Sequence, residues 1–133
     1  MNELQLPVRG ETDLAVAISQ ASRALDAVHA PEEEKVRVLT AVTELSRNIV
    51  KYAGQGKVRF GCSRVGARVL CWVIAEDDGP GIADVHRALE DHFSTGNTLG
   101  LGLPGVRRLM DRMEIDSSPC KGTRIRAERS FVA

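Results

Sequence analysis

Two polar side chains one helical turn apart, Glu44 and Asn48, are the first residues of this sequence that could do chemistry together. Positions four apart project from the same side of a helix. The carboxylate of Glu44 could accept a proton, and the amide oxygen of Asn48 is a hard ligand of the kind that Mg²⁺ prefers. Both residues border the helix's apolar stripe, so we expect them to be half-buried beside a cleft. The alternative is a solvated pair without chemistry.

A second group of residues follows the apolar run 69–75, where three acids lead directly into a glycine turn. Asp77, Gly79 and Gly81 form the pattern Asp-x-Gly-x-Gly. A carboxylate held at a strand end can accept a hydrogen bond from a ligand's amino group, and the glycines let the backbone approach a flat ring closely. A plain turn would explain the same residues, and Asp78 could be the inward-pointing acid instead.

The third group is the stretch GLGLPG, which contains Gly100, Gly102 and Gly105. Backbone rich in glycine can curl its N–H groups around an anion. Pro104 suits the first turn of the helix that we predict over 105–113, and the N-terminus of this helix would face the same anion. A surface loop without a ligand would explain the glycines, but not their position directly before a helix.

The elements that must position these groups follow the order β-α-α-β-β-α-α-β-β. This order indicates an α+β fold, a two-layer α/β sandwich in which helices cover one face of a mixed, mostly antiparallel sheet. Thr12 or Asp13 is the predicted N-cap of the first helix, while Pro31 opens the second helix and Gly54 ends it. The predicted strands cover 4–8, 57–64, 67–76, 114–118 and 122–132, and the predicted helices cover 12–30, 31–53, 83–91 and 105–113.

Composition bounds the class of protein. The 133 residues predict a single domain, 1–133, and the equal numbers of basic and acidic residues, 18 of each, argue against a nucleic-acid binder. The sequence contains neither an apolar run long enough to span a membrane nor a signal peptide, so we expect a cytoplasmic protein.

Cys62, Cys71 and Cys120 lack C-x-x-C spacing, which favours free structural thiols over a metal or redox site. A hairpin turn is predicted at Val65 and Gly66.

Together and in this order, with Gly122 and Thr123 near the last strand, the motifs resemble those of the ATP-binding superfamily of gyrase, heat-shock chaperones, histidine kinases and MutL (GHKL, or Bergerat fold). The resemblance covers nearly the whole chain. The stretches ELSRNIVKYAGQG, AEDDGPGI and LGLGLPGVRRLMD are similar to those of the small serine/threonine protein kinases of bacterial sigma-factor control, which include the switch kinases of the stressosome.

The resemblance implies that the chain binds ATP. By this resemblance Asp77 accepts a hydrogen bond from the adenine amino group, and Gly79 and Gly81 shape the pocket for the base. Thr123 supports the adenine site from the sheet.

For the phosphates, the resemblance implies that Asn48 coordinates Mg²⁺ and that Glu44 is the general base on the attacking hydroxyl. The metal and a helix N-terminus would balance the charge. Arg107 or Arg108 could contact phosphate, or the two could be an exposed basic pair. The implied flexible lid over the phosphates consists of Gly100, Leu101, Gly102 and Gly105.

Three functions remain open at this stage. The first is a serine/threonine kinase that phosphorylates a STAS-domain partner (an anti-sigma-factor antagonist or stressosome protein) and also activates a PP2C-type phosphatase. The second is an anti-sigma factor that binds a sigma factor. The third is a nucleotide-gated binding module without kinase activity, against which the carboxylate of Glu44 argues, because a pure binder needs no base there.

Overall fold

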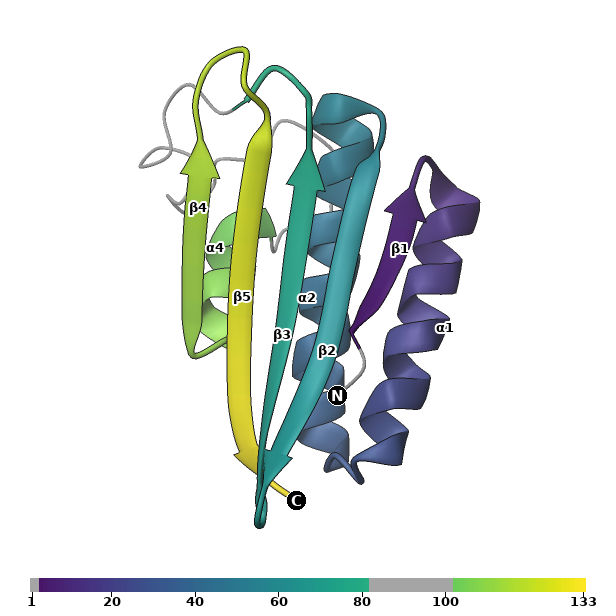
Figure 1. Cartoon of the computed structure of the whole chain (residues 1–133), viewed down its shortest axis with the longest axis vertical. Coiled ribbons are helices and arrows are strands. Elements are labelled where there is room, and N and C mark those ends of the chain that lie inside the picture. Colours follow the sequence, from purple (N-terminus) through teal and green to yellow (C-terminus); the bar gives the residue numbers. More distant parts are fainter. Residues whose placement is uncertain (1–2, 82–101) are drawn as a thin grey trace.

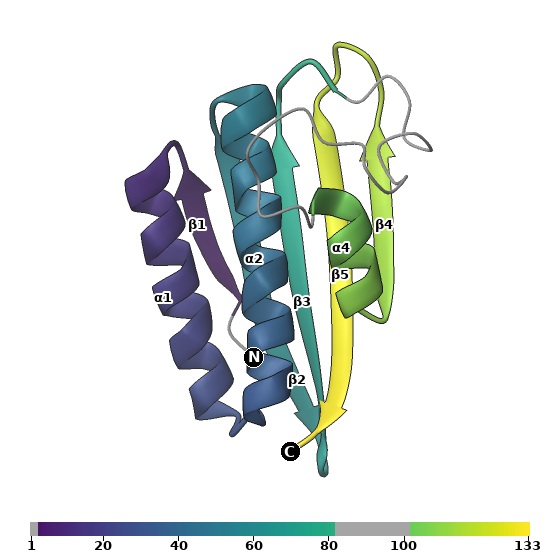
Figure 2. The ribbon, with the colours of Figure 1, turned by 180° about the vertical axis from the view of Figure 1, so that it is seen from behind.

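The computed structural model of the chain describes residues 3–81 and 102–133, which form two layers (Figure 1). The elements are β1 (Leu4–Val8), α1 (Glu11–Ala27), α2 (Glu32–Ala53), β2 (Gly56–Val65), β3 (Arg68–Asp77), α4 (Gly102–Leu109), β4 (Arg112–Ser117) and β5 (Thr123–Val132). The strands form a sheet in the order β1-β2-β3-β5-β4. Helices α1, α2 and α4 all lie against the same face of this sheet (Figure 2). The predicted two-layer α+β fold is confirmed.

The sheet is antiparallel at every pairing between described strands, whereas the sequence predicted a mixed sheet. Its central strand, β3, pairs along its whole length with β2 and β5. The turn between β2 and β3 is Gly66–Ala67, one residue later than predicted. Gly66 has a φ of 62°, which the first position of a tight hairpin turn of this kind requires, and glycine adopts it without strain.

Helix α1 begins one residue earlier than predicted, after Gly10 rather than at an N-cap formed by Thr12 or Asp13. The carboxylate of Asp13 instead accepts hydrogen bonds from the backbone N–H and the Nε–H of Arg9, at 2.9 and 2.8 Å. These bonds attach the end of the first strand to the first turn of the helix. The helix is held to the sheet by Leu14, Ala17, Ala21 and Leu25, which are all buried.

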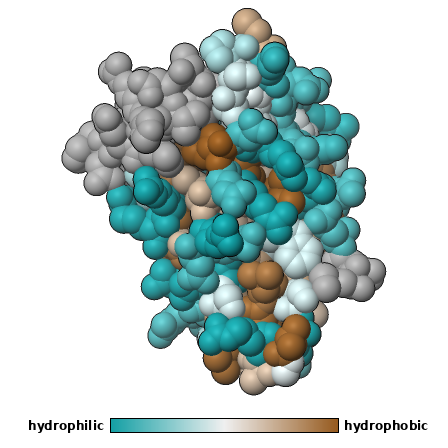
Figure 3. All heavy atoms as spheres, turned by 60° about the vertical axis from the view of Figure 1, so that its left-hand side comes forward, coloured by the Kyte–Doolittle hydropathy of each residue, from teal (hydrophilic) through white to brown (hydrophobic). Residues whose placement is uncertain are grey.

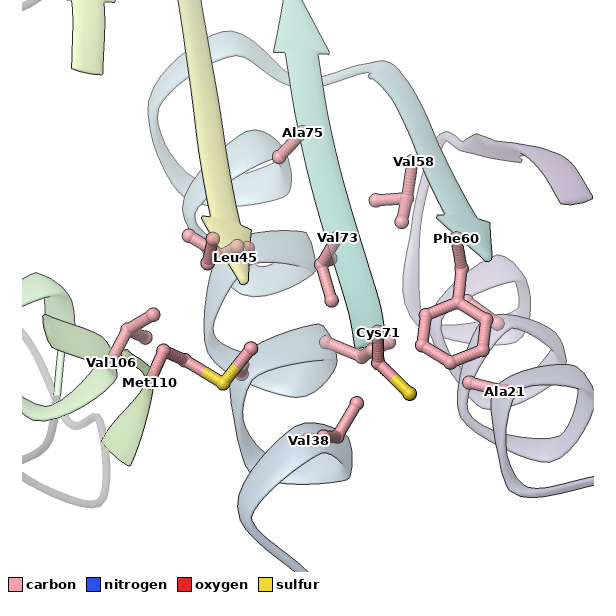
Figure 4. Packing of buried hydrophobic residues seen from close by; sticks show 14 of the residues in the cluster. Ala21, Val38, Leu45, Val58, Phe60, Cys71, Val73, Ala75, Val106 and Met110 are labelled. Carbon is pink, nitrogen blue, oxygen red and sulfur yellow. The ribbon is translucent and has the colours of Figure 1, made fainter. Parts of the chain in front are cut away.

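Helix α2 begins at Glu32, one residue later than predicted, and ends at Ala53 as predicted. It starts directly after Pro31, and it ends where Gly54 takes a φ of 84°. Figure 4 shows Val38 and Leu45 of this helix facing Cys71 and Val73 of β3 across the core. Because side chains alternate along a strand, Asp77 lies on the same helix-covered face as the buried residues Val73 and Ala75. The fold therefore brings Asp77 to the edge of the core.

Polar side chains cover most of the face drawn in Figure 3, where apolar groups form small separate spots. Isolated apolar side chains are normal on a protein surface. Among the residues with described positions, no helix combines the length and the apolar character needed to cross a lipid bilayer.

Candidate functional site

The carboxylate of Asp77 lies at the end of the central strand, in register with Gly56 on one side and Thr123 on the other. Its Oδ1 accepts a hydrogen bond of 2.9 Å from the backbone N–H of Gly79, which fixes the side chain against the turn. Asp77 is half-buried, whereas Asp78 is exposed. Of the two candidate acids, Asp77 is therefore the one that is held in place, and its Oδ2 remains available to a ligand.

Three glycines allow the chain around Asp77 to pack backbone against backbone. A Cβ atom on Gly79 would lie 2.6 Å from the Cβ of Ala53 at the end of α2. A Cβ on Gly81 would lie 2.1 Å from the carbonyl oxygen of Ser118, and one on Gly122 would lie 2.1 Å from that of Asp77. Any side chain at these positions would push the turns apart. Gly81 and Gly122 also have positive φ values of 80° and 81°, which glycine adopts without strain.

The ends of β4 and β5, on either side of the turn that joins these strands, contribute a pair of hydroxyl groups. The hydroxyl of Ser117 donates to the carbonyl of Gly122 at 3.1 Å and lies 2.8 Å from the hydroxyl of Thr123. The backbone N–H of Cys120 in the same turn donates to the carbonyl of Pro80 at 2.8 Å. Sequence reasoning found Thr123 but missed Ser117, which becomes part of the site only through the register between β4 and β5.

These strand ends and turns surround a cavity of about 780 Å³. Within the described part of the chain, the lining includes Asp77 and Thr123 but neither Glu44 nor Asn48. Four basic and four acidic side chains line it, so it has no strong net charge: Arg9, Lys57, Lys121, Arg124, Glu76, Asp77, Asp78 and Asp116.

Glu44 is a buried carboxylate, with only 2% of its surface exposed. The prediction that it is half-buried is wrong for Glu44, whereas Asn48 is half-buried as expected. One carboxylate oxygen of Glu44, Oε1, lies 3.7 Å from Nη1 of Arg47. The other, Oε2, has no hydrogen-bond partner in the described structure. A buried acceptor without a partner is costly, which makes this oxygen a candidate for contact with a ligand or a reacting group.

Helix α2 sets the spacing between the two groups. Ala53, which contacts the turn at Gly79, is the last residue of the helix. With a rise of 1.5 Å per residue, Asn48 lies about 7.5 Å and Glu44 about 13.5 Å before it along the helix axis. The helix therefore presents an amide, and beyond it a buried carboxylate, at increasing distances from the cavity at its C-terminal end.

Helix α4 corrects the predicted start of the fourth helix. It begins at Gly102, not at Gly105, and Pro104 occupies its first turn. Gly102 is the first residue of the helix and has a φ of 49°, whereas Gly105 is buried inside the helix and does not lie in a loop as the predicted lid required. The other two predicted lid residues, Gly100 and Leu101, lie outside the described residues, as does the predicted helix over 83–91.

The first turn of α4 is apolar because it packs onto α2. Leu103 and Val106 are buried there, and the guanidinium of Arg37 on α2 donates to the carbonyl of Leu109 at the helix end, at 3.5 Å. Arg107 and Arg108 are exposed. The packing of α4 beside α2 is visible in Figure 2.

Sequence comparison agrees with this architecture. The family described as "Histidine kinase-like ATPase domain" matches residues 7–129. The serine/threonine-protein kinase RsbT of Bacillus subtilis is 47% identical over 96 residues, which are 71% of this chain and 71% of that protein. The anti-sigma F factor of Caldanaerobacter subterraneus subsp. tengcongensis is 32% identical over 100 residues, 71% of this chain and 68% of that protein. The identity to RsbT supports protein serine/threonine kinase activity.

Solved structures share the fold. The crystal structure of the RsbU and RsbW domains of Rv1364c from Mycobacterium tuberculosis superposes with a TM-score of 0.64 at 17% identity, covering 100% of this chain and 33% of that one. The mycobacterial sensor histidine kinase MprB gives a TM-score of 0.55 at 17% identity, covering 97% of this chain and 96% of that one. The predicted family resemblance is confirmed: this chain belongs to the histidine kinase-like ATPase domains.

Proposed function

We propose that the chain transfers the γ-phosphoryl group of ATP to a serine or threonine hydroxyl of a STAS-domain protein in a bacterial partner-switching pathway. The observation that carries the proposal is the buried carboxylate of Glu44, whose Oε2 has no hydrogen-bond partner among the described residues. It lies on the same helix as Asn48 and as the contact with the glycine turn at Asp77. A base and a ligand for phosphate-bound metal thus follow one another along α2, and the helix ends at the turn beside Asp77, the acceptor for the nucleobase at the end of β3.

At the cavity end, Asp77 would bind the adenine amino group. Its Oδ1 already accepts from Gly79, which leaves Oδ2 for the ligand. Gly79 and Gly81 keep the surrounding backbone close, and Thr123 supports the site from β5 through its contact with the hydroxyl of Ser117. The cavity of about 780 Å³ is large enough for a ligand of nucleotide size.

Asn48 would hold the metal. Its amide oxygen is a hard donor, and it is half-buried between the cavity end of α2 and Glu44, so the residue fits a magnesium ligand. When bound, Mg²⁺ would neutralise charge on the phosphates. Gly100, Leu101, Gly102 and Gly105 remain proposed phosphate-covering residues, now with Gly102 and Gly105 in the first turn of α4.

Glu44 would act as the general base. Its carboxylate takes the proton of the attacking hydroxyl, the hydroxyl oxygen forms the new bond to the γ-phosphorus, and ADP leaves. Burial of Glu44 excludes water from the proton-accepting oxygen, and the guanidinium of Arg47 near Oε1 keeps the carboxylate oriented.

The STAS-domain substrate is supported by similarity alone, through the kinase RsbT and the anti-sigma F factors. Activation of a PP2C-type phosphatase is a further part of the proposal. The 32% identity to an anti-sigma F factor favours a second candidate, a chain that also binds a sigma factor.

A phosphotransfer assay tests the proposal. The purified chain is incubated with labelled ATP, Mg²⁺ and a panel of STAS-domain proteins, and phosphate on serine or threonine is scored. For each partner, a variant with alanine in place of the acceptor serine or threonine serves as the control. Label that reaches the acceptor of one partner supports the proposal. If the chain binds ATP but transfers phosphate to none of these proteins, the result supports a nucleotide-gated binding module instead of a kinase. If the chain also binds a sigma factor, the result supports the additional anti-sigma function.

A further inference from the structure

Cys62 and Cys71 face each other directly across the hairpin of β2 and β3. The two-residue turn Gly66–Ala67 is flanked by Val65 and Arg68, and such a flanking pair exchanges backbone hydrogen bonds. Hydrogen-bonded and non-hydrogen-bonded pairs then alternate along the ladder. Cys62 and Cys71 are the fourth pair from the turn, counting the flanking pair as the first, and so form a non-hydrogen-bonded pair. At such pairs the Cα atoms lie about 4.5 Å apart and the side chains are closest.

The two sulfur atoms are 2.7 Å apart, and both thiols are free. A disulfide needs about 2.05 Å between its sulfur atoms and Cα atoms about 4.4–6.8 Å apart. The backbone spacing of a non-hydrogen-bonded pair already satisfies the second condition. A bond between these sulfur atoms therefore requires a small rotation of side chains and no change of strand register.

The two thiols differ in a way that suits thiol–disulfide exchange. Cys71 is fully buried in the core, as Figure 4 shows, whereas Cys62 is partly exposed. The hydrogen bond between the sulfur atoms lowers the pKa of Cys62, because the Cys71 thiol donates to the Cys62 thiolate. The same bond, together with burial, raises the pKa of Cys71. Cys62 is thus the accessible thiolate, and Cys71 is the thiol held against it.

We propose that Cys62 and Cys71 are a redox modification site that forms a reversible cross-strand disulfide by exchange with a low-molecular-weight disulfide. The Cys62 thiolate attacks one sulfur of the small disulfide, forms a mixed disulfide and releases one small thiol. The Cys71 sulfur loses its proton, attacks the Cys62 sulfur and releases the second small thiol. Two cysteine thiols are oxidised, and one small disulfide is reduced to two thiols.

The site is separate from the proposed kinase site. Asp77 lies six positions after Cys71 on β3, a distance of about 20 Å along the strand. Cys120, the third free thiol, is exposed in the β4–β5 turn beside Pro80 and has no cysteine opposite it in the described strands. It supplies an internal control for ordinary surface reactivity.

The test uses the full reduced chain with oxidised glutathione as the probe. After incubation, free thiols are blocked with N-ethylmaleimide, and tryptic peptides are analysed by mass spectrometry without reduction. We expect peptide 60–64 joined to peptide 69–87 at their summed mass less two hydrogens, and dithiothreitol should separate them. Cys120→Ser should leave this link intact. Cys71→Ser should stop at glutathione bound to Cys62, because the resolving thiol is gone.

Two results would overturn the proposal. In the first, Cys120 of the wild-type chain reacts with glutathione, but Cys62 and Cys71 form no disulfide with each other. Either both are then still alkylated by N-ethylmaleimide, or Cys62 stays bound to glutathione. In the second, the disulfide joins two chains instead of two cysteines of one chain, which a non-reducing gel shows as a dimer. The readout on the wild-type chain does not depend on whether either variant folds.

Discussion

Two glutamates ten positions apart on helix α2 are partnered in opposite ways. Glu34, near the N-terminal end of the helix, accepts two hydrogen bonds from the guanidinium of Arg129 on β5, at 2.7 and 2.8 Å. Arg129 also donates to Asp111 at 2.9 Å. Glu44, near the C-terminus, is more deeply buried than Glu34, yet its Oε2 has no hydrogen-bond partner in the described residues.

The difference separates a carboxylate that supports the fold from one that we propose acts on the acceptor hydroxyl. Arg129 binds both Glu34 and Asp111, so it ties α2 to β5 and to the connection between α4 and β4, and Glu34 is paired within the chain. Glu44 has an ion-pair contact of 3.7 Å with Arg47, and its Oε2 receives no hydrogen bond from the described residues. Burial of an incompletely paired carboxylate is destabilising, and such cost is found where function requires it.

The largest expected effect is on turnover in Glu44→Gln. If Glu44 is the base, this variant should lose phosphoryl transfer by about 10²- to 10⁴-fold and keep ATP and partner binding, because the residue is assigned to the acceptor hydroxyl. Single-turnover transfer from labelled ATP measures the rate, and titration calorimetry measures the affinity.

Glu34→Gln is the matched control for that experiment, since it changes the same group on the same helix. It should transfer phosphate at nearly the parent rate. If Glu44→Gln did the same, the comparison between the two glutamates would have no functional meaning. Equal losses of transfer and of ATP affinity would instead make Glu44 a residue that positions the nucleotide.

Asn48→Ala comes next. The variant should weaken Mg²⁺-dependent ATP binding by about tenfold to a hundredfold or more, because one oxygen ligand is lost and the phosphate charge is poorly neutralised. Asn48→Asp should restore part of the affinity, since a carboxylate also ligates Mg²⁺. Titrations with and without the metal separate this loss from a general defect. A variant that binds Mg-ATP as tightly as the parent would show that Asn48 is no ligand.

Asp77→Asn should have a smaller effect, confined to the nucleotide base. A buried hydrogen bond left unmade costs about 1–3 kcal/mol, which corresponds to roughly a 5- to 150-fold loss of ATP affinity. Asp78→Asn is the control, because Asp78 is exposed at the adjacent position. Calorimetric titration of both variants decides between the two acids, and equal losses would contradict the assignment to Asp77.

The sequence predicted most of the described elements because these depend on local patterns. The limits of α2 follow from Pro31 and Gly54, and the strand before Asp77 follows from its apolar run. The burial of Glu44 could not be predicted in the same way. A helical projection places it at the border of the apolar stripe, but it contains no information about what packs over that border.

Contacts between distant segments were also beyond prediction. Glu34 and Arg129 are separated by 95 positions, and they meet only because the fold brings the first turn of α2 next to β5. The cysteine pair shows how a small error propagates. A turn at Val65 and Gly66 would pair Cys62 with Val69, whereas the observed turn, one residue later, pairs it with Cys71.

The smallest expected effect concerns the stability that Glu34 contributes. Hydrogen bonding from Arg129 lowers the pKa of Glu34, so the folded state favours its ionised form more than the unfolded state does. A group with a depressed pKa stabilises the fold fully above its ordinary pKa of about 4.3, and this stability is lost as the pH falls through the lower folded value. At pH 7, Glu34→Gln should therefore lower the free energy of unfolding by about 1 kcal/mol, since the pair is partly exposed.

Urea denaturation at pH 7 and at steps down to pH 3 tests this expectation, because the gap between parent and Glu34→Gln should close as the acid is protonated. Asp13→Asn is the control: the pKa of Asp13 is also lowered, by hydrogen bonding from Arg9, but that pair is screened by solvent and should matter less. A gap for Glu34→Gln that stayed constant with pH would mean that shape, and not charge, is what Glu34 supplies. Glu34 and Glu44 would then differ in burial alone. The carboxylate charge would no longer distinguish the end of α2 that carries Glu34, which supports the fold, from the end that carries Glu44, the proposed base.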